Sequence, residues 1–228
     1  MKQAVFAWIA AALASQACIA ADLNATERRW MAGVWPVVAA GKAAGLPLDI
    51  VVQPQPASDA APLAMGFVDG RCKLVFSMRM NDEATATLER IEPALLDAAL
   101  ELMAAHELGH CRRYLDGAWF GLPHGFSTPV PAQLDDVSRA AYLQMQAVRR
   151  EEGYADLVGL AWTWQHHPQH YARLLGWLNA ERSRDRIPGS HHDTLAWLRL
   201  AQDGSVLAPA ANFAVPTALW TAGLGAED

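Results

Sequence analysis

The sequence predicts a mostly helical α+β protein with a small antiparallel sheet in its first half. Two long stretches, 94–115 and 132–166, have the length and apolar content of helices, and the middle of the first is apolar on nearly every face, as in a buried helix. Two shorter stretches, 65–67 and 72–80, have the pattern of strands joined by the turn Asp69-Gly70. With 52% apolar and 18% charged residues, the chain of 228 residues has the composition of one globular domain.

Shorter elements complete the predicted fold. The stretch 22–44 favours one helix, disturbed at Pro36, and a proline-rich segment after it leaves room only for a short strand, 50–52. After the two long helices we expect shorter helices over 169–182 and 194–202, and a last helical turn near 217–219.

The first 20 residues differ from the rest of the chain. Lys2 precedes an uncharged run whose apolar centre, 4–14, has the length of a signal-peptide core, and Cys18 and Ala20 place small residues at −3 and −1 of a cut after Ala20. We therefore expect a signal peptide over 1–20, a single domain over 21–228, and a periplasmic or secreted protein. A retained membrane anchor is the alternative, but the segment is mostly alanine, which spans lipid poorly, so no stable membrane insertion is expected after cleavage.

The charge of the chain excludes one class of partner. Its formal net charge is −6, and its basic residues form no stripe of the kind that nucleic acids require. We therefore expect no nucleic-acid partner.

A metal-binding pattern, HELGH, occupies the middle of the predicted helix 94–115. Residues four apart on a helix lie one above the other, so His106 and His110 converge on one point, as two ligands of a tetrahedral Zn²⁺. Glu107 lies beside them, within reach of a water molecule on the metal. Zinc lowers the pKa of such a water from about 15.7 to about 7, and a carboxylate then takes its proton as the water attacks a peptide carbonyl. Two hydrogen-bonded core histidines are the alternative, disfavoured because unpartnered polar groups on a buried helix are costly.

A catalytic zinc site also needs a third protein ligand and one open position. The next predicted helix offers Glu152 and Asp156, which are four residues apart and so share one face. A Glu ligand, with a carboxylate that receives a ligand histidine's free N–H, is the expected arrangement. Glu151 is the other candidate ligand, but it has no Asp four residues on, and beside Arg149 and Arg150 it is typical of a solvated charge. A solvated charge is also the alternative interpretation of Glu152.

The pair of patterns, HELGH and then Glu152-Gly153-Tyr154-Ala155-Asp156 on a second helix, resembles the gluzincin metallopeptidases, and most closely the soluble relatives of the prenyl-protein and heat-shock metallopeptidases. The resemblance covers residues 72–156, about a third of the chain. It implies a zincin-like fold, in which a small sheet packs on the buried motif helix and a helical part follows. It also implies one Zn²⁺ per chain, held by His106, His110 and Glu152, with Glu107 as the general base and Asp156 orienting a histidine.

Two further features depend on this resemblance. Such families carry a downstream residue that steadies the oxyanion, and Ser190-His191-His192-Asp193-Thr194 is similar to their Ser-x-His-Pro stretch. The absent proline and the doubled histidine leave the choice open between His192, which we favour, His191, and a polar loop ahead of a helix cap. In zincins an edge strand before the motif helix holds an extended substrate, and residues 72–80 are the candidate strand here.

Two cysteines, Cys72 and Cys111, remain after removal of the signal segment. In an oxidising compartment they are a candidate disulfide, which would tie the strand to the end of the motif helix, while two buried thiols are the alternative.

These observations predict a zinc-dependent endopeptidase that acts on a protein or peptide substrate outside the cytoplasm. A catalytically idle fold of the same kind, used as a binding or assembly module, is the first alternative. A metal-dependent amidase acting on cell-wall peptides is the second, although such enzymes more often use other ligand spacings.

Overall fold

The computed structural model describes residues 22–57, 60–184 and 186–226, so the predicted signal peptide lies outside the described residues. The described chain is α+β and mostly helical, which confirms the predicted fold class at that level. In chain order the elements are α1 (Ala25–Ala43), β1 (Leu48–Val52), β2 (Leu63–Val68), β3 (Arg71–Phe76), α2 (Asp82–Glu89), α3 (Leu96–Leu115), α4 (Asp136–His166), α5 (Tyr171–Ser183), α6 (Leu195–Leu200) and α7 (Thr217–Leu224), with 3-10 turns at Pro93–Leu95, Pro168–His170 and Gly204–Leu207.

The sheet is mixed, so the prediction of an antiparallel sheet was wrong in part. The strands lie in the order β1-β3-β2, with β1 parallel and β2 antiparallel to β3. Asp69 and Gly70 both have positive φ (51° and 71°), which is the geometry of the tight turn expected between β2 and β3. In β3 the buried residues Cys72, Leu74 and Phe76 alternate with more exposed ones, so Val75 fits the alternation on the outer face of the sheet.

The first helix is continuous through Pro36, contrary to the disturbance that we expected. Its buried face, which includes Trp30, Val34 and Val37, packs on α3, whereas Pro36 lies on the exposed side. Burial of this apolar face offsets the loss of one backbone donor. Helix α2, which the sequence did not predict, begins at an Asn81 cap whose side chain accepts a hydrogen bond from the backbone N–H of Glu83.

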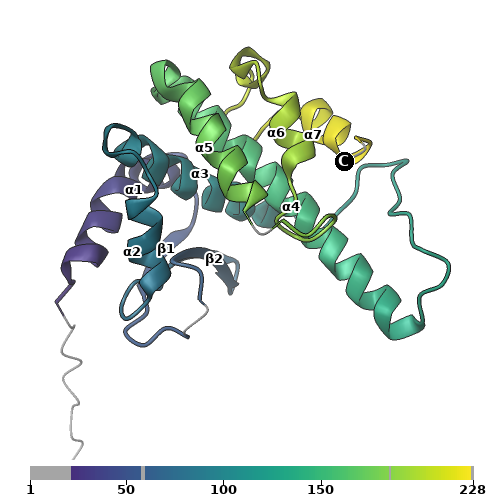
Figure 1. Cartoon of the computed structure of the whole chain (residues 1–228), viewed down its shortest axis with the longest axis horizontal. Coiled ribbons are helices and arrows are strands. Elements are labelled where there is room, and N and C mark those ends of the chain that lie inside the picture. The colour runs from purple at the N-terminus through teal and green to yellow at the C-terminus, as the bar shows by residue number, and fades with distance from the viewer. Residues whose placement is uncertain (1–21, 58–59, 185, 227–228) are drawn as a thin grey trace, which may run out of the picture.

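The two long helices, α3 and α4, pack closely against one another at the centre of the molecule (Figure 1). Glycines make this approach possible. A Cβ on Gly109 of α3 would lie 3.1 Å from Val158, and a Cβ on Gly159 of α4 would lie 2.8 Å from the backbone oxygen of Leu102. Because neither side could yield easily, the crossing depends on these two small residues.

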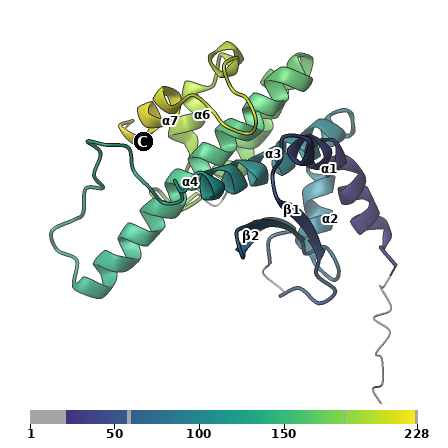
Figure 2. The same cartoon turned by 180° about the vertical axis from the view of Figure 1, so that it is seen from behind.

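Around this pair, the N-terminal elements lie to one side and α5, α6 and α7 lie to the other (Figures 1 and 2). The predicted helices 169–182 and 194–202 appear as α5 and the shorter α6, and the last turn is longer than expected, as α7. The N-terminal part of α4 and the loop that precedes it project together from the rest of the molecule in both views. Among the described residues, no helix has the length and apolarity that a membrane crossing requires.

A disulfide joins Cys72 of β3 to Cys111 of α3, closing a separation of 39 residues, and both cysteines are fully buried. A second link between distant segments is the ion pair of Glu27 on α1 with Arg79, in which two guanidinium nitrogens of Arg79 donate to the buried carboxylate of Glu27. The disulfide thereby holds β3 against the motif helix, and the ion pair holds α1 against the segment that follows β3.

Candidate metal centre

Three side chains from α3 and α4 converge on one point. His106 and His110 lie one turn apart on α3, and Glu152 faces them from α4, so that one potential ligand atom of each lies within 4.8 Å of the others. His106 and His110 are buried, and the side chain of Glu152 is 15% exposed. The structure therefore brings together the three ligands that the sequence motifs predict.

The spacing of these atoms fits a tetrahedral zinc ion. With bonds of about 2.0–2.1 Å, two ligands of such an ion are separated by about 3.3 Å. The two Nε2 atoms of His106 and His110 are 3.1 Å apart; Oε2 of Glu152 lies 3.4 Å from the first and Oε1 lies 3.4 Å from the second. Two imidazole nitrogens and one carboxylate are also a ligand set that catalytic zinc sites use. The residues present thus fit the metal by chemistry and by distance.

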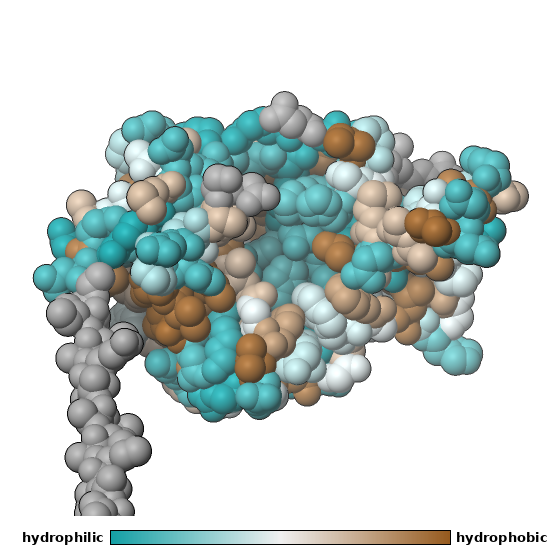
Figure 3. Space-filling model, turned by 90° about the horizontal axis from the view of Figure 1, so that it is seen from below, coloured by the Kyte–Doolittle hydropathy of each residue, from teal (hydrophilic) through white to brown (hydrophobic). Residues whose placement is uncertain are grey.

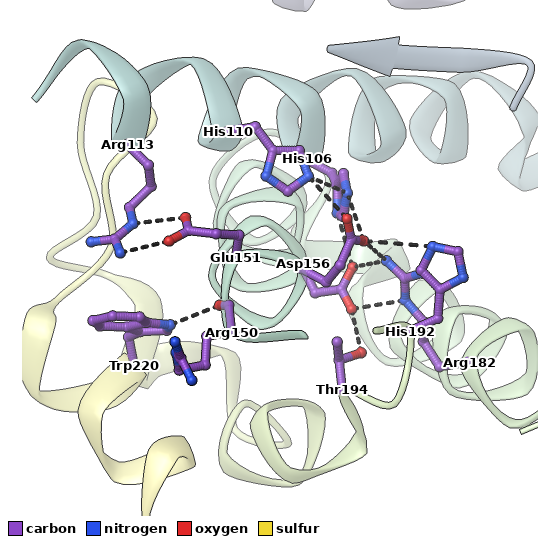
Figure 4. A network of polar contacts seen from close by, with 11 residues as sticks. His106, His110, Arg113, Arg150, Glu151, Asp156, Arg182, His192, Thr194 and Trp220 are labelled. Carbon is purple, nitrogen blue, oxygen red and sulfur yellow. Dashed lines mark hydrogen bonds and ion pairs between the residues drawn. The ribbon is translucent and has the colours of Figure 1, made fainter. Parts of the chain in front are cut away.

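Asp156 fixes the orientation of the first histidine (Figure 4). Its Oδ1 lies 2.9 Å from Nδ1 of His106, an arrangement that keeps the proton on Nδ1 and the Nε2 lone pair turned toward Glu152 and His110. The same carboxylate accepts two hydrogen bonds from Arg182 of α5 and one from the hydroxyl of Thr194. Asp156 is fully buried, and these partners satisfy its charge.

The electrostatics of the centre favour a cation. Burial alone would lower the pKa of His106, but hydrogen bonds to Asp156 and Glu152 raise it to about 10. Burial would likewise raise the pKa of Glu152, yet the hydrogen bonds to His106 and His110 hold it well below its usual value. The ring of His106 lies between the carboxylates of Asp156 and Glu152, and this environment stabilises positive charge at the centre.

Glu107, the predicted base, lies beside the ligands and lines a cleft of about 440 Å³. Burial raises the pKa of its carboxyl above the usual value, and no other side chain among the described residues hydrogen-bonds to it. A carboxylate that is free of partners and has a raised proton affinity suits a group that takes a proton and passes it on.

The two candidate histidines of the downstream loop have different positions. His192 lines the cleft, with its Nε2 4.0 Å from Glu152; 60% of its side chain is exposed, and partial desolvation lowers its pKa. His191 packs against the ring of His192, with centroids 4.1 Å apart, and does not line the cleft. The loop is tied down after His192, where Asp193 accepts from Arg186 and Thr194 donates to Asp156, and before it, where the backbone N–H of Gly189 donates to Asp193. His192 is thus the better placed of the two.

The expectation that Glu151 is a solvated charge was wrong. Its side chain is only 2% exposed and accepts two hydrogen bonds from Arg113 of α3, at 2.9 and 2.8 Å (Figure 4). It also accepts one from the backbone N–H of Phe120. The guanidinium of Arg113 lies 4.4 Å from the ring centroid of Trp220. Glu151 is therefore an anchor between the two long helices and not a metal ligand.

The expected edge strand also needs correction. Residues 71–76 form the central strand β3, so they have no free edge. The outer strands are β1 and β2, and residues 61–65, at the start of β2, line the cleft together with the three predicted ligands. Figure 3 shows one face of the molecule hollowed near its centre, with hydrophilic residues in the hollow and both hydrophobic and hydrophilic ones around it.

Sequence reasoning missed Arg182, Arg113 and the cleft residue Trp119. Arg182 reaches the centre from α5, where its Nη2 lies 3.3 Å from Glu152 in addition to the Asp156 bonds. No local pattern marks these residues, because each acts through partners that are distant in the sequence or on other elements. A long buried helix that ends in two arginines was the one available signal for Arg113.

Comparison of the chain with known protein families, with curated proteins and with solved structures finds no match.

Proposed function

We propose that the protein is a zinc-dependent peptidase, similar to gluzincins in its ligand arrangement, which acts on an exported or cell-envelope protein. The observation that carries the proposal is the convergence of His106, His110 and Glu152, in which the two Nε2 atoms lie 3.1 Å apart and each lies 3.4 Å from one Glu152 oxygen, distances that suit a tetrahedral zinc ion. Glu107 adds a candidate base in the adjoining cleft.

Each residue of the centre has a defined task in this proposal. His106, His110 and Glu152 bind the metal, and Asp156 keeps His106 in the binding tautomer. When bound, Zn²⁺ supplies Lewis acidity that activates water and polarises a carbonyl. Glu107 accepts the proton of the attacking water and delivers it to the leaving amine. His192, at the mouth of the site, donates toward the oxygen on which negative charge develops.

The cleft also supports a polymeric substrate rather than a small molecule. It runs from the start of β2 past the three ligands, and β2 has a free edge to which an extended peptide can add by main-chain hydrogen bonds. An idle binding module of the same fold is the second candidate, and the presence of Glu107 beside the ligands weighs against it. A cell-wall amidase is favoured by no feature of the cleft.

The test begins with metal content. The mature chain, Glu152→Ala and Glu107→Gln are purified in parallel, offered zinc, and examined by elemental analysis and far-UV circular dichroism. We expect about one zinc in the unaltered chain and in Glu107→Gln, and a loss in Glu152→Ala without loss of fold. Folded protein that takes up no zinc would refute the metal centre.

Activity is then measured on an unfolded protein substrate. The unaltered chain should cleave it, a chelator should stop the cleavage, and added zinc should restore it. Glu107→Gln should lower the rate by at least 100-fold while keeping its zinc. Cleavage that continues in Glu107→Gln would contradict the role of this residue, and zinc uptake without any cleavage would favour the idle module.

A further inference from the structure

An aromatic turn forms one wall of the cleft. Residues Trp119 and Phe120, between α3 and α4, both line the cleft. The ring of Trp119 meets His110 edge to face, with centroids 5.5 Å apart, and meets Phe67 of β2 at 4.9 Å. Phe67 in turn stacks on Tyr114 at 4.1 Å. Trp119 is therefore fixed between a metal ligand and the cleft-side strand.

The backbone of this turn is strained. Phe120 has a φ of +60°, in the left-handed region that bulky L-residues rarely adopt. Such a conformation costs free energy and persists only where the surroundings enforce it. At Phe120 the enforcing contact is the hydrogen bond from its N–H to the carboxylate of Glu151.

The anchor of the turn comes from the two helices that carry the metal ligands. Glu151 precedes the ligand Glu152, and Arg113 lies one turn beyond His110. Their buried ion pair holds the turn at two points, because Arg113 also donates to the backbone oxygen of Gly121. The position of Trp119 is thereby tied to the metal centre itself.

The chemistry of this wall favours an apolar side chain of the bound peptide. Val148 and Met65 line the cleft together with the two aromatic rings. The carboxylate that touches the turn, Glu151, is already occupied by Arg113 and Phe120, so it is not available to pair with a cationic side chain. The cleft is not apolar throughout, because the charged residues Glu83, Arg90 and Glu181 also line it.

We propose that the Trp119-Phe120 turn is the specificity wall of the cleft, and that the substrate peptide carries a bulky apolar side chain next to the bond that is cleaved. This inference rests on the proposed peptidase function for its biological meaning, but it can be tested by binding alone. Burial of a side chain such as Phe against the turn should strengthen binding roughly tenfold to hundredfold over Ala.

The test uses zinc-loaded Glu107→Gln, which binds without cleaving. Fluorescein-labelled peptides of Ala, Ser and Gly, each with Phe or Ala at one position, are titrated and followed by anisotropy. We expect one position at which Phe binds roughly tenfold to hundredfold more tightly, and a preference below about threefold once Trp119→Ala is added. If Trp119→Ala does not fold, Trp119→Gln fills more of the space and serves instead.

The control is Phe126→Ala in the same Glu107→Gln background. Phe126 lies on the same loop, is 39% exposed and does not line the cleft, so the preference should survive its replacement. Equal binding of Phe and Ala peptides at every position, or a preference that survives Trp119→Ala, would overturn the inference. A preference that depends on Trp119, in a protein that cleaves none of these peptides with Glu107 restored, would support the wall and overturn the peptidase function.

Discussion

Replacement of Glu151 by alanine should destabilise the protein by about 3–5 kcal/mol, the range for breaking a buried ion pair from one side. The Glu151 side chain is 2% exposed and that of Arg113 is 10% exposed, so water cannot take the place of the lost carboxylate. The substitution leaves the Arg113 guanidinium without its bidentate partner and the N–H of Phe120 without an acceptor. These unpaired groups, more than the lost attraction, account for the magnitude.

The free energy of unfolding is measured by urea denaturation, followed by far-UV circular dichroism in the presence of a chelator, so that metal binding does not contribute. Arg112→Ala is the matched control, because it breaks the exposed pair of Arg112 with Asp116 one residue away and should cost less than about 1 kcal/mol. The double variant Arg113→Met/Glu151→Met should recover much of the loss. A cost below about 1 kcal/mol for Glu151→Ala would show that Glu151 behaves as a solvated charge and would refute the reasoning.

Three further predictions test the packing, the cross-link and the charge balance. Gly159→Ala should cost about 1–3 kcal/mol and weaken zinc binding, because its methyl group pushes α4 away from α3, whereas Gly176→Ala, with open space around its Cβ, should gain about 0.4–1 kcal/mol in the same urea assay. Replacement of both disulfide cysteines by alanine should cost about 4 kcal/mol for a separation of 39 residues, and an unfolding midpoint in urea equal to that of the unaltered chain would contradict this estimate. The hydrogen bond from Arg79 holds the pKa of Glu27 below its usual value, so Glu27 stabilises the fold above about pH 4.3 and loses this contribution as the pH falls through its folded pKa. Glu27→Gln should therefore reduce the loss of stability between about pH 5 and pH 2, and an unchanged pH profile would count against the ion pair.

The predictable part of the fold is local. The long helices followed from their apolar pattern, and α3 and α4 end at the predicted residues, Leu115 and His166. The strand pairing did not follow, because β1 and β3 pair in parallel through contacts that no local pattern encodes. We overestimated the effect of Pro36 on the first helix for a similar reason. The proline does cost local free energy, but the burial of the opposite face of the helix decides whether the helix continues.

The adjacent glutamates 151 and 152 show where sequence reasoning about the site ends. Neighbours on a helix point about 100° apart, so Glu151 and Glu152 cannot face the same partner. The motif spacing selects Glu152 because Asp156 lies one turn on, and the structure places both against His106. The task of Glu151 depends on Arg113, 38 residues earlier, and only the crossing of α3 over α4 makes them neighbours. A charge beside other charges in the sequence is solvated only if its own face of the helix is free, and the packing of the second helix decides that.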